Sequence, residues 1–417
     1  MRKGRERMAK YVIIGNSAAG IGCVEGIRSV DREGDILLIA AEPHHTYGRP
    51  LISYLLEGKT DETRMKYRPD SFYADNGVET RLGVRAVRLD PSGKTVELED
   101  GAKVPYTQLL VATGSVPFVP PMDGLETVEK RFSFMTLDDA KALEAALTPE
   151  SRVLIVGAGL IGLKCAEGIA ARVREITVVD LADRVLPSIL DETGSSIVQA
   201  HLEKQGLRFR LGDTVASFDG GRATLKSGAV LDFDVLVLAV GVRPETSLVA
   251  EAGGAVRRGI VTEDTGRTTL PSVYAAGDCA ESYDISAGVH RVLALLPNAY
   301  MQGYCAGVNM AGGEAHFDQA IPMNAIGFMG LHILTAGTYE GETYMAHENG
   351  NYKVLFYKDD LLKGYILIGD VARAGIYTAL IRNRTPLSSI DFERICEKPQ
   401  LMAFTAQTRR ALLSKQQ

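Results

Sequence analysis

One sequence layout occurs twice in this chain, and it constrains the fold more than any other feature. Residues 11–20 read YVIIGNSAAG and residues 152–162 read RVLIVGAGLIG, so a short apolar strand runs each time into a turn of small residues and an expected helix. A second β-rich stretch follows each copy, at residues 35–40 and 175–180. A strand, a helix and a second strand within about thirty residues form a βαβ unit. The chain is therefore expected to contain two units of the α/β class.

The repeat continues further along both copies. Residues 109–114 and 236–241 are two more apolar stretches that end in glycine. Short alternating segments with turn signals at residues 90–94 and 219–222 come before them. This is the pattern of a small antiparallel crossover sheet. The sequence therefore predicts two Rossmann-like domains, each with such a sheet.

Proline-rich stretches mark two linkers. Three prolines fall within residues 117–121, and Arg243-Pro244 follows the second copy of the repeat. Proline and glycine clusters are the strongest local breaks in regular structure. We therefore predict that the second Rossmann-like domain is inserted in the first. The predicted domains are residues 1–116 with 245–312, residues 117–244, and a C-terminal α+β domain over residues 313–417.

Fewer elements can be placed in the rest of the chain. Residues 273–278 form an expected strand that ends in Gly-Asp, and a polar loop separates it from a helix over residues 298–310. Alternating residues predict strands around 352–357 and 364–368, with a helix from about 372 to 382.

The second copy contains Gly157-x-Gly159-x-x-Gly162, whose chemistry suits a dinucleotide. The first glycine permits a tight turn, the second lets a pyrophosphate approach the backbone, and the third allows close packing of the helix. The N-terminus of that helix adds oriented N–H groups and a partial positive charge. Asp180, at the end of the next strand, is placed to accept hydrogen bonds from both ribose hydroxyls, which favours NADH over NADPH. The residues expected at this site are Gly157, Gly159, Leu160, Ile161, Gly162 and Asp180.

The first copy reads Gly15-x-Ser17-x-x-Gly20, with serine where the middle glycine usually stands. Serine is small enough for this position, and its hydroxyl can donate a hydrogen bond to a phosphate. Glu42 follows the second strand and is placed to hold a pair of ribose hydroxyls. The alternative for Glu42 is a solvated glutamate in a loop.

Composition and charge exclude several classes of protein. The formal net charge is −6 and no long block carries a single sign, so the pattern of a nucleic-acid binder is missing. The five cysteines are scattered without a CxxC pair or a Cys/His cluster, which argues against a disulfide framework, and no metal site is expected. No apolar run reaches the about 18 residues of a membrane span, and the basic start does not lead into a signal peptide. We therefore expect a cytoplasmic protein without membrane insertion.

With these motifs the chain resembles the flavoproteins with two dinucleotide-binding domains, the pyridine nucleotide:disulfide oxidoreductase superfamily. The resemblance covers roughly residues 9–312 and includes Ala112-Thr113-Gly114, Ala239-Val240-Gly241 and Ala276-Gly277-Asp278. It implies that the N-terminal turn takes FAD and that the inserted turn, with Val240 and Gly241, takes NAD(H). It further implies that Asp278 binds the FAD ribityl chain and that Pro297-Asn298 begins a helix aimed at the flavin pyrimidine ring. The residues implied for FAD are Gly15, Ser17, Ala18, Ala19, Gly20, Glu42, Arg49, Pro50, Ala86, Ala112, Thr113, Gly114, Asp278, Pro297 and Asn298.

Residues 43–59 indicate the branch of this superfamily. Members that use a disulfide carry a reactive cysteine here, whereas this chain has none. Tyr47-Gly48-Arg49-Pro50, with Ser53 after it, resembles the rubredoxin and ferredoxin reductases and the flavin domain of assimilatory nitrite reductases. Residues 362–370 resemble the C-terminal domain of the same proteins. This resemblance places Arg49 by the FAD phosphates or the flavin edge and Pro50 against the isoalloxazine.

The chain departs from that branch at two positions. The branch usually has lysine directly after the serine and glutamate two residues past the last glycine of the second turn. This chain has Tyr54 and Lys164 there. Lys164 either brings a positive charge toward flavin N5 or the nicotinamide, where it would be the catalytic candidate, or it faces solvent or pairs with Glu167.

The resemblance implies an FAD-dependent NADH oxidoreductase. Electrons would pass from NADH through FAD to a one-electron carrier, such as a small rubredoxin- or ferredoxin-like iron–sulfur protein, or to a partner redox enzyme. The alternatives are an NADH oxidase or peroxidase, a disulfide or coenzyme A disulfide reductase, and a non-catalytic NAD(H)-responsive flavoprotein. A homodimer formed through the C-terminal domain is a further expectation.

Overall fold

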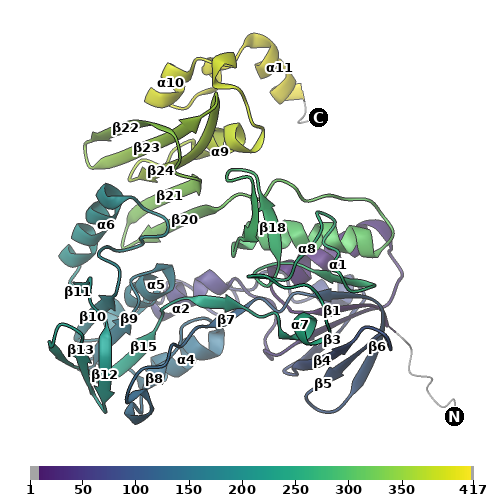
Figure 1. The fold of residues 1–417 in the computed structure, drawn as a ribbon, viewed down its shortest axis with the longest axis horizontal. Coiled ribbons are helices and arrows are strands. Elements are labelled where there is room, and N and C mark those ends of the chain that lie inside the picture. Colours follow the sequence, from purple (N-terminus) through teal and green to yellow (C-terminus); the bar gives the residue numbers. More distant parts are fainter. Residues whose placement is uncertain (1–8, 415–417) are drawn as a thin grey trace.

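The computed structural model describes residues 9–414, so the basic start at residues 1–7 lies outside the described part. Its first sheet has the strand order β3-β2-β1-β6-β5-β4, with β17 beside β6. The core strands run parallel, while β4 and β5 form the antiparallel crossover sheet. We call this the first unit, and it confirms the first predicted Rossmann-like domain (Figure 1). Its strands are β1 (Ala9–Ile14), β2 (Ile36–Ala40), β3 (Val78–Leu82), β4 (Ala86–Asp90), β5 (Thr95–Leu98), β6 (Lys103–Val111) and β17 (Val273–Ala275).

The second unit repeats this architecture. Its parallel sheet has the order β11-β10-β9-β15-β8, and a separate antiparallel sheet is formed by β12, β13 and β14. The central strands are nearly continuous apolar runs because both faces of a parallel sheet are covered. The strands are β8 (Arg131–Phe132), β9 (Arg152–Val156), β10 (Glu175–Asp180), β11 (Arg208–Leu211), β12 (Val215–Asp219), β13 (Arg222–Leu225), β14 (Val230–Asp232) and β15 (Val235–Leu238). The main helices are α4 (Leu137–Ala146), α5 (Leu160–Ile169) and α6 (Glu192–Lys204).

The chain crosses between the two units twice, and the crossings lie side by side. Strand β7 (Ser115–Pro117) leads into the second unit and β16 (Val242–Pro244) leads out of it. They pair antiparallel, with Arg243 opposite Val116. Both crossings contain a proline of the stretches expected as linkers, and the domain division itself stays a prediction.

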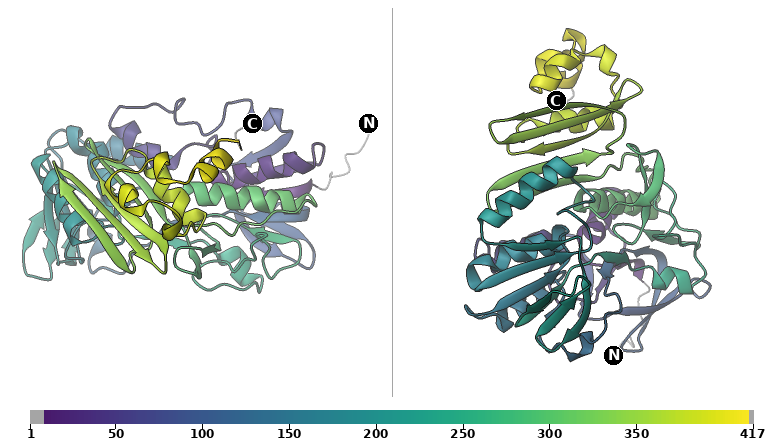
Figure 2. Two further views of the ribbon diagram at one scale, coloured as in Figure 1. Left: turned by 90° about the horizontal axis from the view of Figure 1, so that it is seen from above. Right: turned by 60° about the vertical axis from the view of Figure 1, so that its left-hand side comes forward.

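Helices α1 (Ala18–Val30) and α8 (Leu296–Met310) pack on one face of the sheet of the first unit. Helix α1 follows β1, and α8 runs beside it (Figures 1 and 2). A Cβ atom added at Gly303 would lie 1.9 Å from the Ala19 carbonyl oxygen, so these two helices are in backbone contact. The smaller helices are α2 (Ile52–Leu56), α3 (Phe72–Asp75) and α7 (Ser247–Glu251).

The stretch after Asp278, expected as a polar loop, contains a β-hairpin instead. Strands β18 (Glu281–Asp284) and β19 (Val289–Val292) pair antiparallel. The polar residues misled the prediction because they are buried: Asp284 is fully buried and accepts a hydrogen bond of 2.8 Å from Arg291 Nε. An ion pair between the buried Asp284 and the partly exposed Arg291 therefore takes the place of apolar alternation in this hairpin.

The C-terminal part is a five-stranded antiparallel sheet with helices, which confirms the predicted α+β class. Its strand order is β20-β21-β24-β23-β22, and the predicted strands around 352–357 and 364–368 are β23 and β24. The elements are β20 (Met323–Phe328), β21 (Leu331–Gly337), β22 (Glu342–Glu348), β23 (Asn351–Lys358), β24 (Leu361–Ile368), α9 (Ala374–Arg382), α10 (Phe392–Glu397) and α11 (Ala406–Ser414). Among the described helices, none combines the length and apolar character needed to cross a bilayer.

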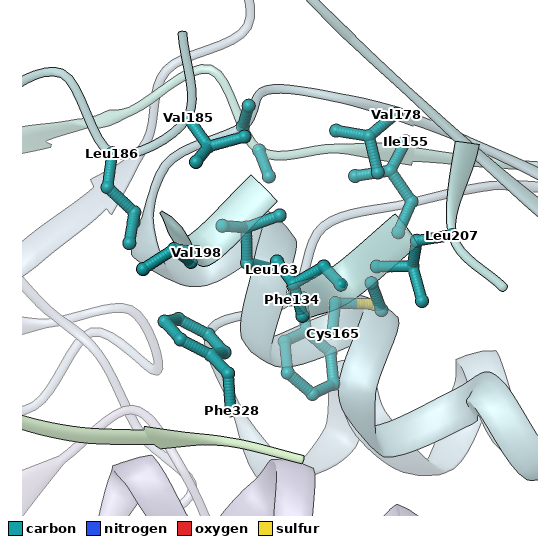
Figure 3. Packing of buried hydrophobic residues seen from close by; sticks show 14 of the residues in the cluster. Phe134, Ile155, Leu163, Cys165, Val178, Val185, Leu186, Val198, Leu207 and Phe328 are labelled. Carbon is teal, nitrogen blue, oxygen red and sulfur yellow. The ribbon is translucent and has the colours of Figure 1, made fainter. Parts of the chain in front are cut away.

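The C-terminal sheet shares a hydrophobic core with the second unit. One cluster of buried side chains joins Leu163 of α5 and Val198 of α6 to Phe328 of β20 (Figure 3). Tyr352 on β23 also donates a hydrogen bond of 2.6 Å to Asp191, which caps α6. Figure 2 shows the sheet standing over α6. The C-terminal sheet is therefore anchored on the second unit.

Candidate cofactor-binding site

A cavity of about 570 Å³ lies where β1, β2 and β6 of the first unit end. Ligands of open α/β sheets bind at the carboxyl ends of the parallel strands, so the position is the one that the repeat predicts. Most residues implied for FAD line this cavity, namely Gly15, Ser17, Ala18, Ala19, Glu42, Arg49, Ala86, Ala112, Thr113, Gly114 and Asp278.

The two glycine turns have the same backbone geometry. Gly15 and Gly157 both have φ +121°, which L side chains rarely adopt. A Cβ atom at Gly15 would lie 2.1 Å from the carbonyl oxygen of Ala112, and one at Gly157 would lie 2.2 Å from that of Ala239. In both units the turn after the first strand therefore touches the end of the neighbouring central strand.

The other positions of the turns also match. A Cβ atom at Gly20 or Gly162 would lie 2.0 Å from the carbonyl oxygen of the first glycine of its turn, so these glycines permit close packing. Gly159 faces open space, with no heavy atom within 4 Å of an added Cβ. Ser17 and Gly159 each precede the first residue of a helix with extended backbone. The first turns of both helices lack acidic residues, which leaves their N–H groups suited to an anion.

Asp278 follows β17 and lies in the cavity beside Arg49 and Ser115. Burial raises the pKa of its carboxyl, while the charge of Arg49 and a hydrogen bond from Ser115 act in the opposite direction. A carboxyl in such a place is stabilised by hydroxyl donors, which the ribityl chain of FAD supplies. The glycine turn and Asp278 together fit this cofactor, and the bound flavin would accept hydride from NADH.

Four other residues implied for FAD do not line the cavity. Gly20 lies beneath the turn, and Pro50 is exposed. Asn298 is 2% exposed and donates a hydrogen bond of 3.1 Å to the Ile321 carbonyl oxygen. Pro297 lies in the first turn of α8, whose residues Leu296 and Ala299 do line the cavity. Direct contact of these four residues with FAD stays a prediction.

The Glu42 carboxylate is bonded to two other residues of the first unit. Its carboxylate accepts a hydrogen bond of 2.6 Å from the Tyr47 hydroxyl and forms an ion pair with Arg49. The solvated-loop alternative does not describe this residue, since the carboxylate is bonded and faces the cavity. Its bond to a ribose stays a prediction.

The nucleotide turn of the second unit is completed by Asp180 at the end of β10. Asp180 Oδ2 accepts from the Ala158 N–H at 2.6 Å, and Oδ1 accepts from the Ala182 N–H at 2.8 Å. The carboxylate thus lies against the glycine turn, where the adenosine ribose of NAD(H) is expected. Leu160 and Ile161 begin α5 and are partly exposed. Val240 and Gly241 follow β15, and Gly241 has φ +120°.

NADPH is expected to be a poorer substrate than NADH. Its 2′-phosphate would lie about 4 Å from the Asp180 carboxylate, a repulsion of up to ~4 kcal/mol at an effective dielectric near 20, reduced by screening. The Asp180→Asn variant keeps an acceptor for the ribose and removes the charge, so the preference should shrink at least tenfold, about 1.4 kcal/mol. Steady-state kcat/KM for both nucleotides measures this. Equal values for the two nucleotides with the unchanged protein would contradict the assignment of Asp180.

Lys164 is bonded inside the protein. Its ammonium forms an ion pair with Glu167, donates to the Gly327 carbonyl oxygen at 3.2 Å and lies 4.3 Å from the centre of the Tyr54 ring. Glu167 is buried and also accepts from the Met329 N–H at 2.6 Å. The paired alternative therefore describes this residue, and Lys164 does not line the FAD cavity. A role at the nicotinamide stays a prediction.

All five cysteines are buried. Burial raises the pKa of the Cys305 and Cys396 thiols to about 11 and also raises that of Cys279, the cysteine next to Asp278. Cys165 lies in the core of the second unit (Figure 3). The reactive form of cysteine is the thiolate, so none of these side chains is suited to attack a substrate. In the described part of the chain, no group of side chains is arranged to hold a metal ion.

Sequence reasoning missed one wall of the cavity. This wall contains His44 and Tyr47 of the first unit. The second unit adds residues that precede α4 or lie in its first turn, namely Ser133, Met135, Thr136 and Asp139. Thr136 and Asp139 form a capping box at the start of α4. That signature is visible in the sequence, but it predicts only the start of a helix.

Comparison with known proteins identifies the family. Residues 9–303 match the family model of the pyridine nucleotide-disulphide oxidoreductases. The chain belongs to this family. Residues 322–385 match a second model, the rubredoxin NAD+ reductase C-terminal domain. As a pyridine nucleotide-disulphide oxidoreductase the protein is an enzyme that uses FAD and NAD(H), in agreement with the two glycine turns.

Relatives with this architecture include subunits of larger enzymes. The chain is 31% identical to the epsilon subunit of the NADH-dependent phenylglyoxylate dehydrogenase of Aromatoleum evansii, over 91% of this chain and 93% of that protein. It is 30% identical to the nitrite reductase [NAD(P)H] of Bacillus subtilis over 91% of this chain, but it spans only 48% of that protein. The structure of the covalent putidaredoxin reductase–putidaredoxin complex contains the same fold, with a TM-score of 0.85, 22% identity and 98% of each chain covered.

Proposed function

We propose that this flavoprotein carries electrons from NADH through FAD to a small iron–sulfur protein or to the iron–sulfur centre of a partner enzyme. The observation that carries the proposal is the absence of a thiol at the flavin: within the described residues, no cysteine lines the FAD cavity. Without a thiol to reduce, electrons leave the flavin directly for an acceptor. A protein that carries one electron at a time can accept electrons from the flavin in this way.

The relatives support this acceptor class. The C-terminal part matches the domain named for rubredoxin NAD+ reductase, and the phenylglyoxylate dehydrogenase subunit matches over almost its whole length. That subunit is named as part of an NADH-dependent enzyme, which favours a partner redox enzyme as one form of the acceptor. A reductase of the same fold is known in complex with putidaredoxin.

The site itself is built to align two cofactors. The first glycine turn and Asp278 hold FAD, and the second glycine turn and Asp180 hold NADH. The flavin supplies the redox chemistry when bound, while the chain fixes the distance and excludes water.

The proposal also covers how the chain is organised. The division into residues 1–116 with 245–312, 117–244 and 313–417 is supported by the adjacent crossings β7 and β16. A reducing cytoplasm is supported by five cysteines that form no disulfide. The homodimer through the C-terminal domain stays a prediction.

The test offers several acceptors to the protein reduced by NADH under anaerobic conditions. Rubredoxin, ferredoxin, coenzyme A disulfide and oxygen are supplied in turn, and NADH oxidation is followed by absorbance. An iron–sulfur carrier is expected to turn over faster than oxygen or the disulfide. Turnover with the disulfide alone would contradict the proposal, and turnover fastest with oxygen would favour an NADH oxidase.

A further inference from the structure

One wall of the FAD cavity comes from the second unit. Residues 133–139, which we call the covering segment, comprise the connection from β8 to α4 and the first turn of α4, and they contribute four residues to the lining. The glycine turn and Asp278 lie on the first unit. FAD in this cavity is therefore held between two units, and the chain passes from one to the other through β7 and β16.

His44 connects the covering segment to the turn that holds the FAD phosphates. Its Nε2 lies 2.7 Å from Oδ1 of Asp138, across the interface between the units. Its carbonyl oxygen accepts a hydrogen bond of 3.2 Å from the Asn16 side chain, and Asn16 is part of the glycine turn. The imidazole also lines the cavity and is 21% exposed. One residue thus touches the cofactor turn, the cavity and the opposite unit.

Two further contacts hold the same segment in place. The Leu137 N–H donates to the Tyr47 hydroxyl at 2.9 Å, and Arg49 donates to the Met135 carbonyl oxygen at 3.1 Å. Tyr47 and Arg49 also bind Glu42 in the cavity, so replacing them would disturb the cofactor contacts directly. Asp138 does not line the cavity, so removing its side chain breaks the contact with His44 across the interface and leaves the pocket lining in place.

We propose that His44 and Asp138 fasten the covering segment over bound FAD and thereby slow its dissociation. They act as positioning residues, because the segment and not the cofactor is what their contact holds. The inference rests on the proposed function only in that FAD occupies this cavity. A contact between partly exposed groups is modest, so removing it should change the rate of FAD release by about two- to fivefold.

The test measures FAD dissociation without any turnover. Holoprotein is diluted into FAD-free buffer, and the return of free-flavin fluorescence gives the rate. His44→Ala and Asp138→Ala should each release FAD about two- to fivefold faster. The double variant should release it no faster than His44→Ala alone, because that variant already removes the contact with Asp138. Asp138→Asn keeps an oxygen acceptor for the imidazole and should stay within about twofold of the unchanged protein.

The same helix supplies a matched control. Lys141 forms an ion pair of 2.9 Å with Glu62, also between the two units, and neither residue lines the cavity. Lys141→Ala should leave the release rate unchanged. The inference is overturned if Asp138→Ala releases FAD at the normal rate, or if Lys141→Ala accelerates release as much as Asp138→Ala. A protein that binds no FAD at all would overturn the proposed function together with this inference.

Discussion

Replacing Lys164 with alanine is expected to lower the free energy of unfolding by ~3 kcal/mol, because it leaves a buried carboxylate without its cation. Glu167 is only 4% exposed at its side chain, and the Met329 N–H would remain as its hydrogen-bond donor. The loss should appear as a fall of roughly 5 °C or more in the thermal midpoint. Far-UV circular dichroism and calorimetry of the holoprotein measure it.

Two further variants test whether the loss of stability comes from the unpaired buried carboxylate. Lys164→Met with Glu167→Gln removes both charges and keeps the side-chain volume, so it should recover most of the lost stability. Lys59 also lies near the Tyr54 ring, at 6.0 Å, but its side chain is 57% exposed. Lys59→Ala should change stability by less than about 0.5 kcal/mol. If Lys164→Ala is as stable as the parent and only slows flavin reduction by NADH, Lys164 acts at the nicotinamide instead.

Two alanine substitutions in the glycine turn of the second unit are expected to have different effects: one lowers stability, and the other raises the KM for NADH. Gly157→Ala should destabilise the second unit by more than ~3 kcal/mol, because the new Cβ would lie 2.2 Å from the Ala239 carbonyl oxygen at a strained φ. Gly159→Ala places its Cβ in open space, so stability should stay within about 0.5 kcal/mol. That space is where a pyrophosphate approaches the backbone, and the KM for NADH should rise at least about tenfold, or ~1.4 kcal/mol.

Flavin content provides the internal control for this pair. FAD binds in the first unit, so Gly159→Ala should keep its full flavin absorbance. Stopped-flow reduction by NADH and equilibrium unfolding together give the two effects. An unchanged KM for Gly159→Ala would mean that the dinucleotide does not pass over this turn.

The parts of the site that could be predicted are those governed by local sterics. Gly15 and Gly157 are recognisable because the turn after a central strand admits no other residue at their backbone angles and contacts. Asp180 is recognisable because it ends the next parallel strand, a position fixed by the βαβ unit. Both therefore follow from short sequence windows.

The parts that could not be predicted depend on contacts between distant segments. His44 and Asp138 are separated by 94 residues and meet only because two folded units face each other. The strand β18 was not recognised because Asp284, a buried carboxylate paired with the partly exposed Arg291, gives it the composition of a loop. Lys164 left two alternatives open, since the choice depends on where Gly327 and Met329 of another domain lie. No pattern within a single segment carries this information.

The most direct test of the central claim is the number of electrons that the protein accepts. Under anaerobic conditions, NADH is titrated into the holoprotein and the flavin absorbance is followed, with the bound FAD counted beforehand. A flavin without a redox-active thiol accepts two electrons, so one equivalent of NADH per FAD should complete the reduction, and each equivalent should then reduce two molecules of a one-electron carrier. Uptake of two equivalents of NADH per FAD would reveal a second two-electron centre, which in this chain can only be cysteine, and would contradict the account.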